Sequence, residues 1–159
     1  MSKISYYIDT MCENVSDFKC EYKVFKDYLL YRSDNAVVHY LIEPLSDTLI
    51  GYFSLISSGL LYRESDELSF ISAIELKMFA IDDSYRNVGV AADIFHSIVK
   101  TISHFATEYI GAEVILLYSV PVPYVISLYE SEGFQQIDDT FTTFQSEFTD
   151  GCVPMIKAL

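Results

Sequence analysis

The feature that most constrains the fold is one segment with helical periodicity that lies between two segments with the pattern of apolar strands. Residues 71–81 have the pattern of a long strand, and residues 113–118 form a continuously apolar one. Between them, apolar residues recur at helical spacing from about Val90 to Ala106, and Gly111 follows as a stop signal. Two strands joined by one helix of this length form a parallel pair. The sequence therefore predicts a sheet with at least one parallel βαβ unit.

Further patterns on both sides of this unit complete a mixed sheet. An apolar stripe at 4-3-4-3-4 spacing from Met11 to Leu29 predicts one long N-terminal helix. Residues 36–42 and 49–56 predict an antiparallel hairpin, and residues 57–69 an acidic loop. The other predicted elements are a polar loop at 82–89, a helix from Pro123 to Glu132, and closing strands at 134–137 and 152–158. We expect an α/β (α+β) fold in one domain, residues 1–159, with a mixed, mostly antiparallel central sheet, one parallel βαβ crossover and helices on both faces.

The charge of the chain restricts its partners. The 159 residues carry a formal net charge of −13, and residues 1–32 are balanced, so the excess of acid lies in the remainder. Nucleic acid and anionic membranes attract a positive field, and this charge disfavours both. The longest uncharged run, Val114–Tyr129, has 16 residues and contains two prolines, so it does not predict a membrane span. A cationic or neutral partner is favoured.

A glycine-containing loop joins the strand at 71–81 to the helix that follows it. Arg86 to Ala91 reads Arg-Asn-Val-Gly-Val-Ala. Gly89 allows a close approach of the backbone to an anion, and the free N–H groups at the start of a helix form a phosphate site together with the helix dipole. A six-residue pattern of this kind is weak evidence by itself.

A second segment strengthens the first. Leu128 to Phe134 reads Leu-Tyr-Glu-Ser-Glu-Gly-Phe and follows the apolar strand at 113–118. In this order and spacing, the two segments resemble those of the GCN5-related N-acetyltransferase (GNAT) family, whose loop reads Gln/Arg-x-x-Gly-x-Gly/Ala and whose second segment ends in Tyr-x-x-x-Gly-Phe. The resemblance covers about residues 36–137. It implies a GNAT-like fold and acetyl-CoA as co-substrate.

The resemblance also implies roles for individual residues. Those that would hold acetyl-CoA by their backbone, or frame its loop, are Met78, Phe79, Ala80, Arg86, Asn87, Val88, Gly89, Val90 and Ala91. Residues 78–80 would pair with the pantetheine arm, and residues 88–91 would bind the pyrophosphate. Tyr129 would be the general acid that protonates the departing thiolate. Glu75 would be the general base that takes a proton from the attacking ammonium.

Each role has an alternative that the residues leave open. Tyr129 is one of 13 tyrosines, and its alternative is a packing role. Glu75 lies on an alternating strand, where its side chain points either into a substrate cleft or into solvent. Val122 stands where many family members have an asparagine. Asp82 and Asp83, which precede the loop, are expected to be solvated.

The leading hypothesis is an acetyl-CoA-dependent N-acetyltransferase that acts on a primary amine. The acidic body favours a cationic small molecule, or a peptide or protein amine, as acceptor. One alternative is the toxin-type branch of the family, which acetylates aminoacyl-tRNA. Three segments resemble that branch: residues 25–33, residues 51–55, and residues 116–134 without the asparagine. Nucleic acid is a partner only under that alternative, and the net charge of −13 weighs against it. A second alternative is a non-catalytic acyl-CoA-binding module. Dimers are common in the family, which allows a homodimer.

The cysteines and histidines predict no metal site. Cys12, Cys20 and Cys152 have no metal-ligand spacing, and we expect free, buried thiols in a reducing compartment. The histidines also lack metal-like spacing and are expected to be structural or exposed. The first residues contain no signal-peptide pattern, so we expect a cytoplasmic protein without membrane partners.

Overall fold

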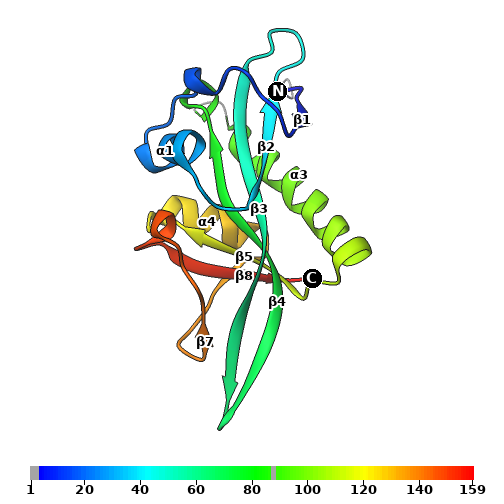
Figure 1. Cartoon of the computed structure of the whole chain (residues 1–159), viewed down its shortest axis with the longest axis vertical. Coiled ribbons are helices and arrows are strands. Elements are labelled where there is room, and N and C mark those ends of the chain that lie inside the picture. Colours follow the sequence, from blue (N-terminus) through cyan, green and yellow to red (C-terminus); the bar gives the residue numbers. More distant parts are fainter. Residues whose placement is uncertain (1–3, 87–88) are drawn as a thin grey trace. The chain divides into compact units, whose positions relative to one another are not determined.

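The computed structural model describes residues 4–86 and 89–159, which divide into two compact units. The first unit comprises Met1–Leu55 and Lys77–Phe95, and the second comprises Ile56–Leu76 and His96–Leu159. The strands are β1 (Tyr7–Asp9), β2 (Val37–Ile42), β3 (Leu49–Glu64), β4 (Glu67–Ile81), β5 (Val114–Ser119), β6 (Gln135–Gln136), β7 (Phe141–Thr142) and β8 (Val153–Ala158) (Figure 1). The α-helices are α1 (Lys23–Tyr31), α2 (Asp83–Arg86), α3 (Val90–Phe105) and α4 (Pro123–Ser131). Short 3-10 turns η1 (Val15–Asp17) and η3 (Glu147–Thr149) and a π-helical turn η2 (Ala106–Ile110) complete the described elements.

The sheet is mixed and mostly antiparallel, as predicted. In the first unit β1 pairs with β2, and β2 with β3, in antiparallel fashion. In the second unit β4 and β5 are parallel, with Ala73 opposite Val114 and Leu76 opposite Leu117. There β8 lies antiparallel between β5 and β6, and β7 pairs with β3. The parallel βαβ crossover is therefore confirmed.

The first unit has an aromatic core beneath α1. Tyr28 and Tyr52 are fully buried and stack with ring centroids 6.2 Å apart. Phe18 meets the Tyr52 ring edge-on at 5.6 Å. The Tyr52 hydroxyl donates to the Phe25 carbonyl at 2.7 Å, so the one polar atom of this buried ring has a partner. These contacts hold α1 on the first unit mainly through Tyr28, which is not one of the residues of the predicted stripe.

The prediction of one long helix from Met11 to Leu29 is wrong, because α1 begins only at Lys23. The backbone N–H groups of Lys19 and Glu21 donate to the carboxylates of Asp82, at 2.8 Å, and Asp83, at 3.1 Å. These side chains take donors that an α-helix would use internally, and the segment runs extended instead. Asp82 is buried in this role, so the expectation that it is solvated is also wrong.

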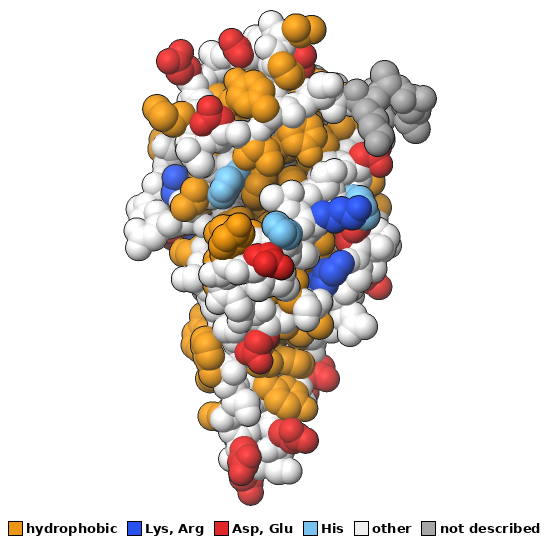
Figure 2. All heavy atoms as spheres, turned by 90° about the vertical axis from the view of Figure 1, so that its right-hand side faces the viewer, with side chains coloured by type: hydrophobic (Ala, Val, Ile, Leu, Met, Phe, Trp, Pro, Cys, Tyr) orange, Lys and Arg blue, Asp and Glu red, His pale blue; other side chains and the backbone are white. Residues whose placement is uncertain are grey.

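The prediction of an acidic loop at 57–69 is wrong as well. Strands β3 and β4 continue through this region and meet at a tight turn at Ser65, which has a positive φ of 55°. Residues 63–70 are exposed and include Glu64, Asp66 and Glu67 together with Leu68 and Phe70. Figure 2 shows acidic and hydrophobic side chains side by side on the surface. Charged residues at a hairpin tip are compatible with strands because the side chains there face water on both sides.

Gly51 is a position where β3 leaves no room for a side chain. A Cβ atom there would lie 2.5 Å from the Ala80 carbonyl oxygen and 2.8 Å from Cδ1 of Ile81. We expect Gly51→Ala to lower the free energy of unfolding by about 1–3 kcal/mol, since it overpacks a site bounded by backbone. Urea unfolding followed by circular dichroism measures this. Ser57→Ala, on an exposed position of the same strand, is the control and should change stability by less than about 0.5 kcal/mol. Equal stability of the two variants would contradict the close approach.

The cysteines are free, as predicted, although Cys12, Cys20 and Cys152 are partly rather than fully buried. The described residues contain no cluster of histidine, cysteine and carboxylate side chains that could hold a metal ion. Within the same residues, no helix is both long enough and apolar enough to cross a membrane.

Candidate functional site

The glycine loop ends at the start of α3 in the first unit. Asn87 and Val88 lie outside the described residues. Gly89 has a positive φ of 71°, and apart from its neighbours in the chain no heavy atom of the described residues lies within 4 Å of the position that a Cβ would take. Val90 and Ala91 then open a helix of 16 residues. An open, left-handed glycine directly before a helix N-terminus fits the approach of a phosphate group to backbone donors.

Arg86 lies at the end of α2 and is held by acidic neighbours. Its Nη1 donates to a carboxylate oxygen of Glu21 and to one of Asp83, each at 3.2 Å. Its guanidinium also lies over the Tyr22 ring, 5.7 Å from the centroid. These contacts tie the end of α2 to the N-terminal segment, and the framing role of Arg86 stays a prediction. The charge of Arg86 is shared with two carboxylates, which weakens its pull on an anion.

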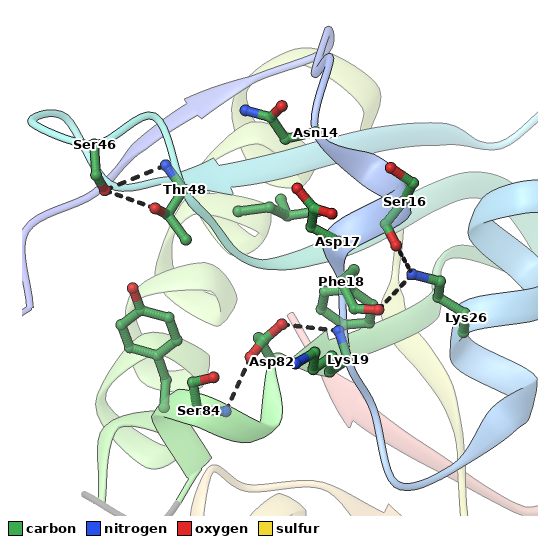
Figure 3. Close-up of a pocket in the computed structure, with 12 residues that line it drawn as sticks. Asn14, Ser16, Asp17, Phe18, Lys19, Lys26, Ser46, Thr48, Asp82 and Ser84 are labelled. Atoms are coloured by element: carbon green, nitrogen blue, oxygen red, sulfur yellow. Dashed lines mark hydrogen bonds between the residues drawn. The ribbon is translucent and has the colours of Figure 1, made fainter.

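A polar hollow of about 610 Å³ lies in the first unit before the glycine loop (Figure 3). Sequence reasoning missed it, because its lining comes from four separate parts of the chain, namely residues 14–19, Lys26 of α1, residues 46–49 and residues 82–85. The Lys26 ammonium donates to the carbonyls of Ser16 and Phe18. Asp82 accepts from the N–H groups of Lys19 and Ser84. These bonds hold the wall of the hollow together, so both charged groups already have a structural use.

The C-terminal part of β4 carries the residues expected to pair with pantetheine. Met78 and Ala80 are buried, and the ring of Phe79 packs on Phe95 of α3 at 5.2 Å. Lys77 precedes them and forms an ion pair with Asp34, Nζ to Oδ2 at 3.0 Å. Burial raises the pKa of Asp34, but its bonds to Lys77 and Tyr28 outweigh this and hold the pKa below its ordinary value. The ion pair and the ring contact therefore anchor the C-terminal part of β4 within the first unit.

Glu75 is buried within the second unit, with 7% of its surface exposed. The Ser58 hydroxyl on β3 donates to its Oε1 at 3.1 Å. Glu75 lies opposite Leu116 of β5 in the parallel register. Leu116 in turn precedes Tyr118 by two residues on the same strand. The alternative in which Glu75 points into solvent is therefore wrong. A buried carboxylate that accepts a hydrogen bond from a hydroxyl group is more typical of a functional position than of a surface charge.

Tyr129 occupies the last turn of α4, with 9% of its surface exposed. Gly133 has a φ of 92°, a left-handed conformation that ends the helix. The turn brings the Phe134 ring edge-on to Tyr129 at 6.3 Å, and the Phe134 N–H donates to the Tyr129 carbonyl at 3.2 Å. The spacing Tyr-x-x-x-Gly-Phe thus has a physical basis. Burial, with a smaller contribution from Cys152, raises the pKa of Tyr129, so its phenol stays protonated at neutral pH.

The structure divides the predicted residues between the units. Glu75 and Tyr129 belong to the second unit, whereas residues 78–91 belong to the first. Sequence reasoning missed Ser58, because residues 57–69 were expected to form a loop. The two-residue spacing of Ser58 and Leu60 was the signal that could have identified Ser58, since residues two apart on a continuing strand share a face.

Comparison with known proteins identifies the fold. No protein-family model and no curated protein matches the chain. Among solved structures, one described as a bacterial toxin is 18% identical, with a TM-score of 0.73 over 97% of this chain and 88% of that one. A tyrosine-to-phenylalanine mutant of the AtaT toxin is 13% identical, with a TM-score of 0.72 over 99% and 93%. The chain has a GNAT-like fold.

A third match describes AtaT complexed with acetyl-methionyl-tRNAfMet, at 14% identity and a TM-score of 0.70 over 97% of this chain and 95% of that one. Another solved structure contains the AtaTR complex bound with acetyl-CoA. At these identities the likeness establishes the GNAT-like fold alone.

Proposed function

We propose that this chain is an acetyl-CoA-dependent N-acetyltransferase. The observation that carries the proposal is Tyr129, a buried and protonated phenol that the Gly133 turn fixes at the end of α4. The open glycine before α3 and the buried carboxylate of Glu75 support it. An anion-binding helix start, a base and an acid are the groups that acyl transfer from a thioester to an amine requires.

Acetyl-CoA would supply an activated acetyl group on a thioester. Backbone N–H groups of residues 88–91 would hold its pyrophosphate, and the backbone of Met78, Phe79 and Ala80 would orient the pantetheine arm. Gly89 fits this role because nothing occupies the space above its Cα. Backbone donors require no basic surface, which reconciles the binding of an anionic co-substrate with a net charge of −13.

Proton transfers accompany the exchange of bonds. The Glu75 carboxylate would take one proton from the acceptor ammonium, which frees the nitrogen lone pair for attack on the carbonyl carbon. A C–N bond then forms and the C–S bond breaks, while the Tyr129 hydroxyl would give its proton to the departing sulfur. The acylated nitrogen still carries one proton too many, and its loss would restore the Tyr129 phenol. Glu75 would release its proton to water, so the products are the amide, the CoA thiol and one proton.

The acceptor that the comparisons favour is the α-amino group of an aminoacyl-tRNA. The similar structures are toxins, and one of them is complexed with an acetylated methionyl-tRNA. This reverses the preference that the net charge suggested. If it is right, transfer to charged tRNA should weaken steeply as salt rises, because phosphate contacts release counterions. Under the same hypothesis the chain would also bind an antitoxin protein, since a similar solved structure has an AtaT mutant toxin bound to the C-terminus of the antitoxin AtaR.

The second candidate acceptor is a cationic small amine. The charge of −13 favours it, because an acidic surface concentrates cations. Release of free CoA thiol, measured with total charged tRNA and with a panel of polyamines and aminoglycosides, separates the two. Turnover with charged tRNA alone supports the toxin-type activity, and turnover with amines alone rejects it.

Calorimetric titration with acetyl-CoA completes the test. Binding without turnover on any acceptor would leave a non-catalytic acyl-CoA-binding module. Absence of both binding and turnover would reject the proposed function altogether.

A further inference from the structure

We infer that Ser58 is a positioning residue that holds Glu75 in its charged, proton-accepting form. The inference rests on the proposed function, because it concerns the base of the same reaction. Neither of the two sequence segments that resemble the GNAT family contains Ser58. Its hydroxyl donates to Oε1 of Glu75 at 3.1 Å from the neighbouring strand of the same unit.

The surroundings of Glu75 explain why it needs such a donor. Ala73 lies two residues before Glu75 on β4, so it shares a face with it, and Leu116 lies opposite in β5. That face carries a buried apolar cluster of Leu60, Ala73, Val114, Leu116 and Tyr118. A carboxylate beside such a cluster loses the stabilisation that water gives to its charge. A hydroxyl donor restores part of this stabilisation and fixes which way the carboxylate faces.

The other titratable groups of this cluster cannot replace Glu75 as proton acceptor. Burial raises the pKa of Tyr118 on β5, and the charge of Glu75 raises it further. The Thr143 side chain and the Phe144 backbone lie beside its hydroxyl, although neither meets it with the geometry of a full hydrogen bond. Burial also raises the pKa of Cys152, which packs against the same cluster. Both groups are therefore protonated at neutral pH and can accept no proton.

Loss of the Ser58 hydroxyl has a predictable sign. Hydrogen bonding to the charged form of an acid favours that form, so its removal makes the carboxylate take up a proton at higher pH. A protonated Glu75 cannot accept the ammonium proton. The acid limb of the pH–rate profile should therefore move toward higher pH, which a purely structural role of Ser58 would not produce.

The test compares three variants of the full chain. Ser58→Ala should move the acid limb of the kcat profile upward by about one pH unit, with KM for the acceptor nearly unchanged. Ser58→Thr keeps the hydroxyl and should restore the wild-type profile. Ser57→Ala, on the exposed neighbouring position, should leave the profile unchanged. A Ser58→Ala profile that coincides with the wild type would overturn the inference.

A second measurement is independent of turnover. Carbon-13 NMR of labelled glutamate, assigned through Glu75→Gln, follows the titration of Glu75 directly in the wild type and in Ser58→Ala. An upward displacement of its midpoint supports the inference even when the acceptor is unknown. An unchanged midpoint overturns it. Failure of the wild type to turn over any acceptor would reject the proposed function while this titration still decides the role of Ser58.

Discussion

Tyr129→Phe should lower the rate of acetyl transfer by about 10²–10⁴-fold, the range typical of a lost general acid. The substitution removes one oxygen and leaves the ring, so the edge-on packing against Phe134 is retained. Acetyl-CoA affinity should change by less than about threefold, because the phenol acts on the leaving sulfur and not on the bound ground state. Steady-state release of CoA thiol and calorimetric titration with acetyl-CoA measure the two quantities.

The control for this change lies on the same helix. Tyr124 is on the first turn of α4 and is exposed, so Tyr124→Phe removes an equivalent hydroxyl from a position away from the buried end. Its rate should match the wild type. If Tyr129→Phe keeps the wild-type rate as well, the phenol has only a packing role and the proposed mechanism loses its acid.

Glu75→Gln should reduce the rate by about 10²–10³-fold at neutral pH, with a deficit that shrinks as pH rises. Glutamine keeps the size of the side chain and an oxygen that can accept the Ser58 bond, but it cannot take a proton. An α-amino group ordinarily has a pKa of about 8, so above about pH 9 it is already neutral and needs no base. Rate profiles from pH 6 to pH 10 measure the effect.

A constant deficit across this range would contradict the base role of Glu75. It would show that the substitution harms positioning or folding at every pH. Urea unfolding of Glu75→Gln separates these cases, because the neutral amide should leave stability within about 1 kcal/mol of the wild type in this buried setting.

Local patterns predicted the parts of the fold that depend on local physics. The parallel pairing of β4 and β5 followed from the single predicted helix between two predicted apolar strands. The end of the helical segment formed by α3 and the π-helical turn η2 followed from Gly111, and the end of α4 from Gly133, and both glycines adopt the left-handed conformation. The placement of Glu75 on a strand followed from the pattern of residues 71–81, but its burial beside an apolar cluster did not, because alternation left its side chain facing either a cleft or solvent.

The parts that could not be predicted depend on distant partners. Nothing near Lys19 and Glu21 indicates that their N–H groups bond to carboxylates more than 60 residues away, which interrupts the expected helix. The long hairpin was hidden because its tip is acidic and faces water, so composition there resembles a loop. Ser58 was missed together with the hairpin, because its role depends on its hydrogen bond to Glu75, which lies 17 positions further along the chain.

The hairpin formed by β3 and β4 gives the acidity of this chain a second meaning. Parallel pairing with β5 covers β4 from Ala73 to Leu76, and the outer stretch before it presents Leu68 and Phe70, which are 55% and 66% exposed. A strand edge with apolar side chains is a template on which other chains aggregate. Asp66 and Glu67 stand at the tip, so two such edges that meet bring like charges together. The acids at the tip thus oppose edge-to-edge association of two such hairpins.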